Sequence, residues 1–159
     1  MATHLKNLST YDPDSIPDGS SFHIGIAVAE WNHDVTGKLL EGCLDALGKA
    51  GVPEANITVN WVPGTFELPL ACQWLAKENK MDAVIGIGCV IQGETRHFDF
   101  ICQATATAMQ DVALSSNKPC IFGVLTTDNL EQALDRSGGK HGNKGVEAAV
   151  TALKMLGIR

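Results

Sequence analysis

The sequence predicts an α/β protein of three layers, in which helices cover both faces of a four-stranded parallel sheet. Four apolar runs of strand-forming residues alternate with helical patterns along the 159 residues, and these runs span 22–29, 57–62, 83–91 and 120–126. Strands that alternate with helices favour parallel pairing through right-handed crossovers. The stretch from Ala83 to Ile87 contains no polar residue, which is typical of a strand that is buried on both faces.

The helices are predicted from the spacing of apolar residues. In the first helical segment the apolar residues recur every four positions, at Val35, Leu39, Cys43 and Leu47. Asp34 is expected to cap this helix and Gly51 to end it. The other helices are expected at 67–79, 97–116, 129–137 and 144–156, and the glycine-rich segment 138–142 is expected to be a linker between the last two.

The length of the chain fits one domain with a single hydrophobic core. We assign this domain to residues 22–159. Residues 1–21 mix Asp, Pro, Ser and Lys, and we expect them to form an N-terminal arm that is available to contact a neighbouring subunit. A sheet of four strands leaves its edges exposed unless this arm or another subunit covers them, so the pattern favours an oligomer.

The charge and the cysteines restrict the partners and the location. The formal net charge is −6, and no run of basic residues could neutralise a nucleic-acid backbone. No apolar stretch has the length of a membrane span or the pattern of a signal peptide, which predicts a cytoplasmic protein without a membrane partner. The five cysteines are widely spaced in apolar segments and are expected to be reduced and mostly buried. The histidines and cysteines show no metal-ligand spacing, so no metal is expected.

The candidate site lies in the loops that follow the strands. In an open parallel sheet, ligands bind beyond the carboxyl ends of the strands. Polar and aromatic residues occupy all four of these loops, in the segments 30–33, 63–67, 92–97 and 126–128. The sequence therefore predicts that they converge on one rim of the sheet.

The third loop has the features of an anion site. Gly93 permits a close backbone approach, and the amides that follow it, together with Thr95, could form a nest for an anion at a helix start. The spacing of Gly88, Gly93 and Thr95 superficially matches a phosphate-binding loop. Glu94, however, stands where such a loop requires its lysine, and this replacement removes the mechanism. The glycine pattern of a dinucleotide fold is also incomplete here.

Four side chains near the rim each have a functional and a structural interpretation. His97 lies next to the predicted nest, where it could move protons beside a phosphate, or it could be an exposed residue at a helix start. Trp31 and Phe66 could stack on a flat heterocycle or serve ordinary packing. Glu67 could bind a substrate or stabilise the start of its helix. The pattern alone leaves these alternatives open.

Several motifs closely resemble the lumazine synthase family. They are Pro63-Gly64-Thr65-Phe66-Glu67-Leu68-Pro69, the stretch 88–99 with Gly93-Glu94-Thr95-Arg96-His97-Phe98, Phe122-Gly123-Val124-Leu125-Thr126-Thr127-Asp128, and Arg136 with Gly139-Lys140-His141-Gly142-Asn143-Lys144-Gly145. The resemblance runs in order from Phe22 to the end of the chain.

The resemblance implies a flavodoxin-like subunit in a homopentamer with active sites shared between neighbours. It implies an enzyme that condenses 5-amino-6-(D-ribitylamino)uracil with 3,4-dihydroxy-2-butanone 4-phosphate. The product is 6,7-dimethyl-8-ribityllumazine, formed with release of phosphate and water in the penultimate step of riboflavin biosynthesis. His97 would be the proton carrier, and the reaction would need no cofactor. By the same resemblance, the ribitylaminouracil would be bound by Trp31, Asn32, Thr65, Phe66, Glu67, Cys89, Val90, Ile91, Phe122 and Lys144. The phosphate would be bound by Glu94, Thr95 and Arg136, with Arg136, Phe122 and Lys144 coming from the adjacent subunit.

Two positions depart from the commonest pattern of that family. Trp31 stands where a phenylalanine is more usual, and its larger ring should stack more strongly on a flat ligand such as riboflavin. Gln92 replaces a residue that is usually basic, which leaves more of the positive field to Arg136 and Lys144. The alternative function from another class is a flavin-binding or storage module without turnover. A two-state receiver domain is disfavoured because Asp82 lies at the wrong end of its strand.

Overall fold

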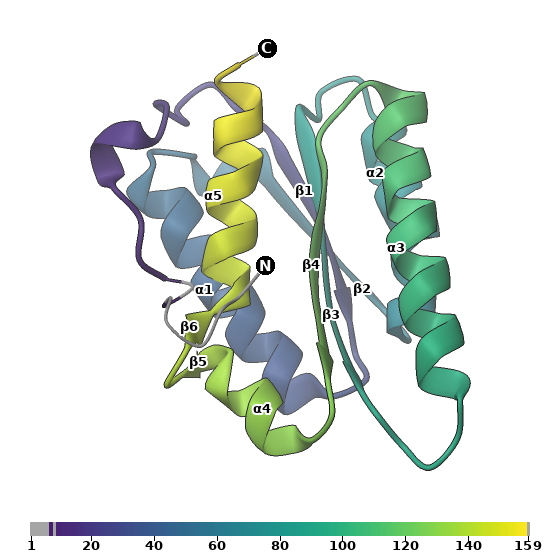
Figure 1. The fold of residues 1–159 in the computed structure, drawn as a ribbon. Coiled ribbons are helices and arrows are strands. Elements are labelled where there is room, and N and C mark those ends of the chain that lie inside the picture. Colours follow the sequence, from purple (N-terminus) through teal and green to yellow (C-terminus); the bar gives the residue numbers. More distant parts are fainter. Residues whose placement is uncertain (1–6, 8, 159) are drawn as a thin grey trace.

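The computed structural model describes residues 7 and 9–158, and it contains the predicted four-stranded parallel sheet (Figure 1). The strands of this sheet are β1 (Ile24–Ala29), β2 (Ile57–Val62), β3 (Ala83–Ile91) and β4 (Cys120–Thr127). Their order across the sheet is β2-β1-β3-β4, with β1 and β3 in the centre. All neighbouring pairs are parallel.

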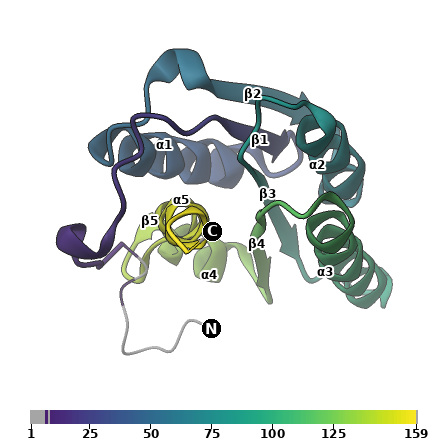
Figure 2. The same ribbon diagram turned by 90° about the horizontal axis from the view of Figure 1, so that it is seen from above.

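Helices cover both faces of the sheet. The longer helices are α1 (His33–Lys49), α2 (Leu68–Lys77), α3 (His97–Ser116) and α5 (Lys144–Leu156), and the short α4 spans Leu130–Asp135. Figure 2 shows α1, α4 and α5 on one side of the sheet and α2 and α3 on the other. The three-layer, flavodoxin-like arrangement that the sequence predicts is therefore confirmed.

The two faces of the sheet have separate hydrophobic cores. On the face of α1 and α5, Ile26, Leu39 and Leu153 are fully buried members of one cluster. On the face of α2 and α3, Leu68 and Met109 belong to a second cluster. Every residue of β1 is buried, because a central strand covered on both faces has no side that reaches water.

Some predicted boundaries are wrong. Asp34 does not cap α1. The chain enters the helix through Asn32 in the left-handed conformation, which places Asp34 in the first turn. The second helix starts at Leu68 instead of at Glu67, because Thr65–Glu67 forms a separate 3-10 turn (η3). The first strand begins at Ile24 and not at residue 22, because the His23 amide donates to the Asp82 carboxylate, at 2.8 Å, instead of to a neighbouring strand.

The segment 138–142 is more than a linker. Ser137–Gly139 (β5) and Gly142–Asn143 (β6) form a small antiparallel hairpin. Gly138 has φ of 118° and Gly142 has φ of 82°, which are backbone conformations that favour glycine. The preceding helix, predicted over 129–137, is shortened to α4 because Asn129 is its N-cap and Ser137 joins the hairpin.

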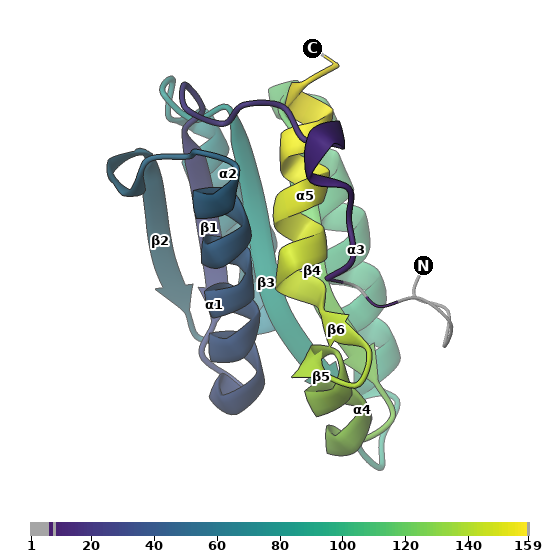
Figure 3. The same ribbon diagram turned by 90° about the vertical axis from the view of Figure 1, so that its left-hand side faces the viewer.

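The N-terminal segment packs along its own chain. The Asn143 amide donates to the Ser9 hydroxyl at 2.9 Å, and the Gly19 amide donates to the Ala50 carbonyl at 2.7 Å. Between them, Tyr11 packs against the core on the face of α1 and α5, and a short 3-10 turn (Pro13–Ser15) lies near α5 (Figure 3). A further 3-10 turn, Glu54–Asn56, precedes β2.

Candidate functional site

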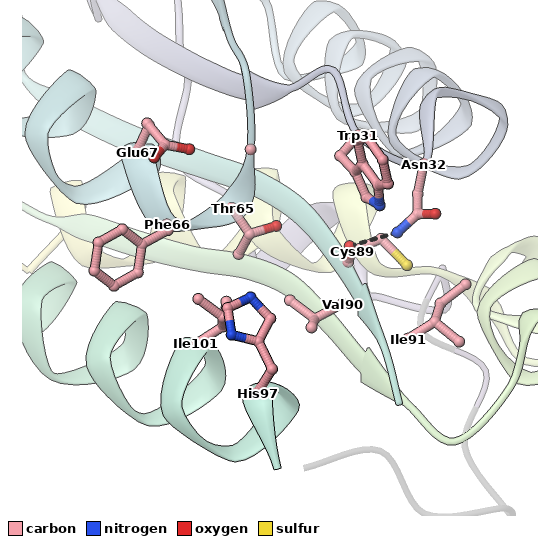
Figure 4. Close-up of a pocket in the computed structure, with 11 residues that line it drawn as sticks. Trp31, Asn32, Thr65, Phe66, Glu67, Cys89, Val90, Ile91, His97 and Ile101 are labelled. Atoms are coloured by element: carbon pink, nitrogen blue, oxygen red, sulfur yellow. Dashed lines mark hydrogen bonds between the residues drawn. The ribbon is translucent and has the colours of Figure 1, made fainter. Parts of the chain in front are cut away.

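A cavity of about 620 Å³ opens at the carboxyl end of the sheet, where the first three loops meet (Figure 4). Its size is within the range of small-molecule sites. The lining residues come from the loops after β1 and β2, the end of β3 and the start of α3, and they are Trp31, Asn32, Gly64, Thr65, Phe66, Glu67, Cys89, Val90, Ile91, His97 and Ile101. One cavity thus unites nine of the residues that the sequence analysis selected.

Two aromatic side chains are exposed at this cavity. Trp31 follows β1, and its amide donates to the Pro63 carbonyl at 3.2 Å, which holds it beside the loop after β2. The Trp31 side chain is 73% exposed and that of Phe66 is 56% exposed. Large apolar rings with this much exposure are available to a ligand, since burying them on binding removes apolar surface from water.

The 3-10 turn that carries Thr65 fits closely against the sheet. Thr65 is buried, and its Oγ1 lies 2.7 Å from the position that a Cβ would occupy on Gly88. A larger residue at position 88 would therefore displace Thr65. Thr105 of α3 donates a long hydrogen bond of 3.5 Å to the Thr65 carbonyl. Glu67 is exposed at the end of the same turn, where its carboxylate can accept hydrogen bonds from a polar ligand.

The end of β3 forms an apolar wall of the cavity. Cys89 is buried there, and burial raises the pKa of its thiol to about 12. The thiolate is the nucleophilic form of cysteine, so Cys89 is uncharged and unreactive at neutral pH. Val90 and Ile91 continue this wall and are half-buried.

His97 is the first residue of α3, and Figure 4 shows its ring among the lining side chains, near Ile101. The His97 amide is 3.4 Å from the Thr95 hydroxyl, which belongs to the exposed loop before the helix. An imidazole in this place can exchange a proton with a ligand in the cavity, because neutral imidazole carries both a donor and an acceptor nitrogen.

The remaining selected residues lie outside the cavity. Glu94 and Thr95 are in the exposed loop between β3 and α3, and Phe122 of β4 packs against the α2 and α3 cluster. Arg136 follows α4 and Lys144 begins α5, on the opposite face of the sheet from α3.

The two basic residues are held close to each other by the backbone. The Lys144 amide donates to the Arg136 carbonyl at 2.9 Å, across the β5–β6 hairpin. The Lys144 ammonium pairs with Glu147 at 2.7 Å, and Arg136 donates at 3.4 Å to the Gln132 carbonyl. Lys144 is thus a partly buried, paired residue at the helix start.

Two lining residues were absent from the sequence-based selection. Ile101 lies one helical turn after His97, so the four-residue spacing on one helix face could have identified it. Gly64 stands within a motif that was recognised, but glycine offers no side-chain chemistry to mark it. Among the described residues, no group of three or more His, Cys, Asp or Glu side chains could hold a metal ion. Within the same part of the chain, no helix is both long enough and apolar enough to span a membrane.

The fold and the cavity define a flavodoxin-like α/β protein with a small-molecule site at the carboxyl end of its sheet. A model of the family described as 6,7-dimethyl-8-ribityllumazine synthase matches residues 21–159. Proteins with that name are 62% identical in Cytophaga hutchinsonii, over 98% of both chains, and 54% identical in Porphyromonas gingivalis, over 99% of this chain and 98% of the relative. A third, from Parabacteroides distasonis, is 51% identical over 98% of both chains. The chain therefore belongs to the 6,7-dimethyl-8-ribityllumazine synthase family and is an enzyme, a transferase.

Proposed function

We propose that this protein condenses 5-amino-6-(D-ribitylamino)uracil with 3,4-dihydroxy-2-butanone 4-phosphate to form 6,7-dimethyl-8-ribityllumazine, the penultimate step of riboflavin biosynthesis. The observation that carries the proposal is the single cavity that holds Trp31, Glu67 and His97 together. A flat uracil ring needs a stacking surface, its ribityl chain needs hydrogen-bonding groups, and the condensation needs a proton carrier. Membership of the family supports the same reaction.

The reaction begins when the 5-amino group of the pyrimidine attacks the ketone, and loss of water gives an imine. Phosphate is then eliminated, and the ribitylamino nitrogen closes the second ring with loss of a further water. No step needs a nucleophile from the protein, which agrees with the uncharged thiol of Cys89. His97 carries protons during imine formation and phosphate elimination. The alignment of two substrates in one cavity supplies much of the remaining acceleration.

The ribitylaminouracil occupies the cavity itself. Trp31 stacks on its pyrimidine ring, and the other contacts come from the loop after β2 and the end of β3, namely Thr65, Phe66, Glu67, Cys89, Val90 and Ile91. The exposed indole of Trp31 and the apolar end of β3 support this placement. Asn32 lies beside them, with its side chain directed at the Cys89 carbonyl.

The phosphate is bound at the outer end of the cavity. Glu94 and Thr95 contribute backbone and hydroxyl contacts from the exposed loop, and Arg136 of an adjacent subunit supplies the cation. Phe122 and Lys144 of that neighbour complete the site. The separation of Arg136 and Lys144 from the cavity within one chain supports a site that two subunits share. The assembly that provides such sites is a homopentamer.

Three further properties belong to the proposal. Riboflavin binds by stacking on Trp31, because the indole offers a large exposed surface for a flat ring. The N-terminal arm, residues 1–21, adds contacts to a neighbouring subunit beside the single domain of residues 22–159. The protein works in the cytoplasm.

The test is product formation from the two substrates, followed by absorbance and fluorescence. We expect a rate well above the background without protein and a strong decrease in Arg136→Ala. Lys154→Ala is the matched control, because it removes a cation from the last turn of α5, away from the cavity. Tight binding of riboflavin without any acceleration would overturn the proposal in favour of a flavin-storage module.

A further inference from the structure

Asn32 has a backbone conformation that few residue types accept. Its φ is 61° and its ψ is 44°, and among the described residues the other non-glycine residue with positive φ is Asn117. An N-cap residue usually has extended backbone and uses its side chain to cap the helix. Asn32 precedes α1 but makes no such cap. Its backbone carbonyl accepts from the Val35 and Thr36 amides, which leaves the side chain available for another task.

That side chain reaches across to β3. The Asn32 amide nitrogen donates to the Cys89 carbonyl at 2.9 Å, and this bond is drawn as a dashed line in Figure 4. The distance is that of a well-formed hydrogen bond. Left-handed backbone at Asn32 is therefore coupled to a contact between the loop after β1 and the end of β3.

The bond lies where the sheet opens. Pairing between β1 and β3 ends at Val28 and Ile87. On one side, the Glu30 amide donates to the Val62 carbonyl at the end of β2, and the Trp31 amide donates to the Pro63 carbonyl in the loop that follows. On the other, β3 continues to pair with β4 as far as Ile91. The bond from the Asn32 side chain to the Cys89 carbonyl joins these two halves across the opening. Among the described residues, no other side-chain hydrogen bond does so.

We propose that Asn32 is a positioning residue, whose hydrogen bond to the Cys89 carbonyl fixes the separation between Trp31 and the end of β3. This inference rests on the proposed function, because the opened part of the sheet is the place for the pyrimidine ring. The two walls of that place belong to different halves of the sheet. A fixed separation lets both walls contact a flat ring without being reorganised on binding. Asn32 thus acts before the substrate arrives, by organising the empty cavity.

The test replaces the amide in two ways. Asn32→Asp keeps a residue that tolerates left-handed backbone but exchanges the donor for a carboxylate, which repels the Cys89 carbonyl. Asn32→Gly adopts this backbone without strain and carries no charge, so an effect common to both variants comes from the lost bond. Asn117→Asp and Asn117→Gly are matched controls, because Asn117 has φ of 52° and lies at the opposite end of α3 from His97.

The decisive measurement is hydrogen exchange of the protein without ligand. In both Asn32 variants we expect the segment 30–36 to exchange about 2- to 12-fold faster, the range that corresponds to one net hydrogen bond. The Asn117 variants should leave this segment unchanged. In steady-state kinetics, the KM for the ribitylaminouracil should rise by a similar factor while kcat changes less than about 2-fold, the pattern of lost uniform binding.

Unchanged exchange of segment 30–36 in both Asn32 variants would overturn the inference, even if KM rises, because Asn32 would then act by touching the substrate. Faster exchange with an unchanged KM would overturn it as well. If the wild-type protein shows no turnover, the proposed function fails. The exchange data, with riboflavin affinity in place of KM, then decide the role of Asn32 separately.

Discussion

Replacing Asn143 with alanine should destabilise the protein, because its buried side chain joins the start of α5 to α1. Asn143 is 8% exposed, and its Oδ1 caps α5 by accepting from the Gly145 amide at 2.8 Å and the Val146 amide at 3.4 Å. Its Nδ2 donates to the Lys38 carbonyl of α1 at 2.8 Å. A single residue therefore holds the beginning of α5 against the middle of α1.

The cost of Asn143→Ala is the sum of two losses. Removal of an N-cap acceptor costs about 1 kcal/mol. Loss of the partly buried hydrogen bond to the Lys38 carbonyl costs about another 1 kcal/mol, so we expect the free energy of unfolding to fall by about 2 kcal/mol. Asn143→Ser should recover roughly half of this, since serine is a good N-cap but is too short to replace the bond to Lys38.

The assay is urea unfolding at one fixed protein concentration, because association changes the apparent stability. Asn129→Ala is the matched control. Asn129 caps α4 by accepting from the Gln132 amide at 2.9 Å, and it is exposed. Its loss should cost only the capping contribution. Equal destabilisation by Asn143→Ala and Asn129→Ala would refute the reasoning, since the bond from Asn143 to α1 would then add nothing.

Three further perturbations have defined outcomes. His97→Ala should lower kcat by roughly 10²- to 10⁴-fold and leave measurable turnover, whereas His23→Ala, at the other end of the sheet, should leave kcat unchanged. Complete inactivity of a folded His97→Ala protein would contradict the proton-carrier role. Trp31→Ala should weaken riboflavin binding by about 2- to 12-fold in a fluorescence titration, from lost stacking, and an equal effect of Trp74→Ala, which is exposed on α2 outside the cavity, would argue against it. Burial raises the pKa of Cys43 from its ordinary 9.0 to about 12. Above pH 9 the unfolded chain therefore loses this proton before the folded chain does. The contribution of Cys43 to stability should be intact below pH 9 and should fall by about 1.4 kcal/mol per pH unit as the pH rises towards 12. Urea midpoints at rising pH should fall less steeply in Cys43→Ala, and identical slopes would refute the assignment.

Much of the fold could be predicted because its signals are local. The bounds of β2, β3, α3 and α5 agree with the sequence-based prediction, since apolar periodicity and flanking polar residues define them. The predicted start of α1 was wrong because the chain enters this helix through Asn32, whose side chain is hydrogen-bonded to the carbonyl of Cys89, 57 residues away. The hairpin of β5 and β6 was missed for a similar reason. Three- and two-residue strands have no periodicity of their own and are defined only by pairing.

The candidate site was predictable to a different degree in its two parts. The rule that ligands bind beyond the carboxyl ends of parallel strands placed Trp31, Phe66 and His97 near one another, and all three line one cavity. The roles of these side chains are not fixed by their placement and stay predictions. The positions of Arg136 and Lys144 relative to a cavity depend on how subunits associate, and neither periodicity nor spacing within one chain contains that information.

Within one subunit Trp31 lines the cavity and Arg136 lies outside it, and this separation has a genetic consequence. If a site takes its stacking surface from one chain and its cation from the next, two different defects can complement each other. Chains with Trp31→Ala and chains with Arg136→Ala would each be impaired alone. In randomly mixed rings about a quarter of the sites would receive an intact residue from both neighbours. Co-expressed defective alleles would therefore regain activity that neither possesses separately, as expected of an active site that is encoded once but assembled from two copies.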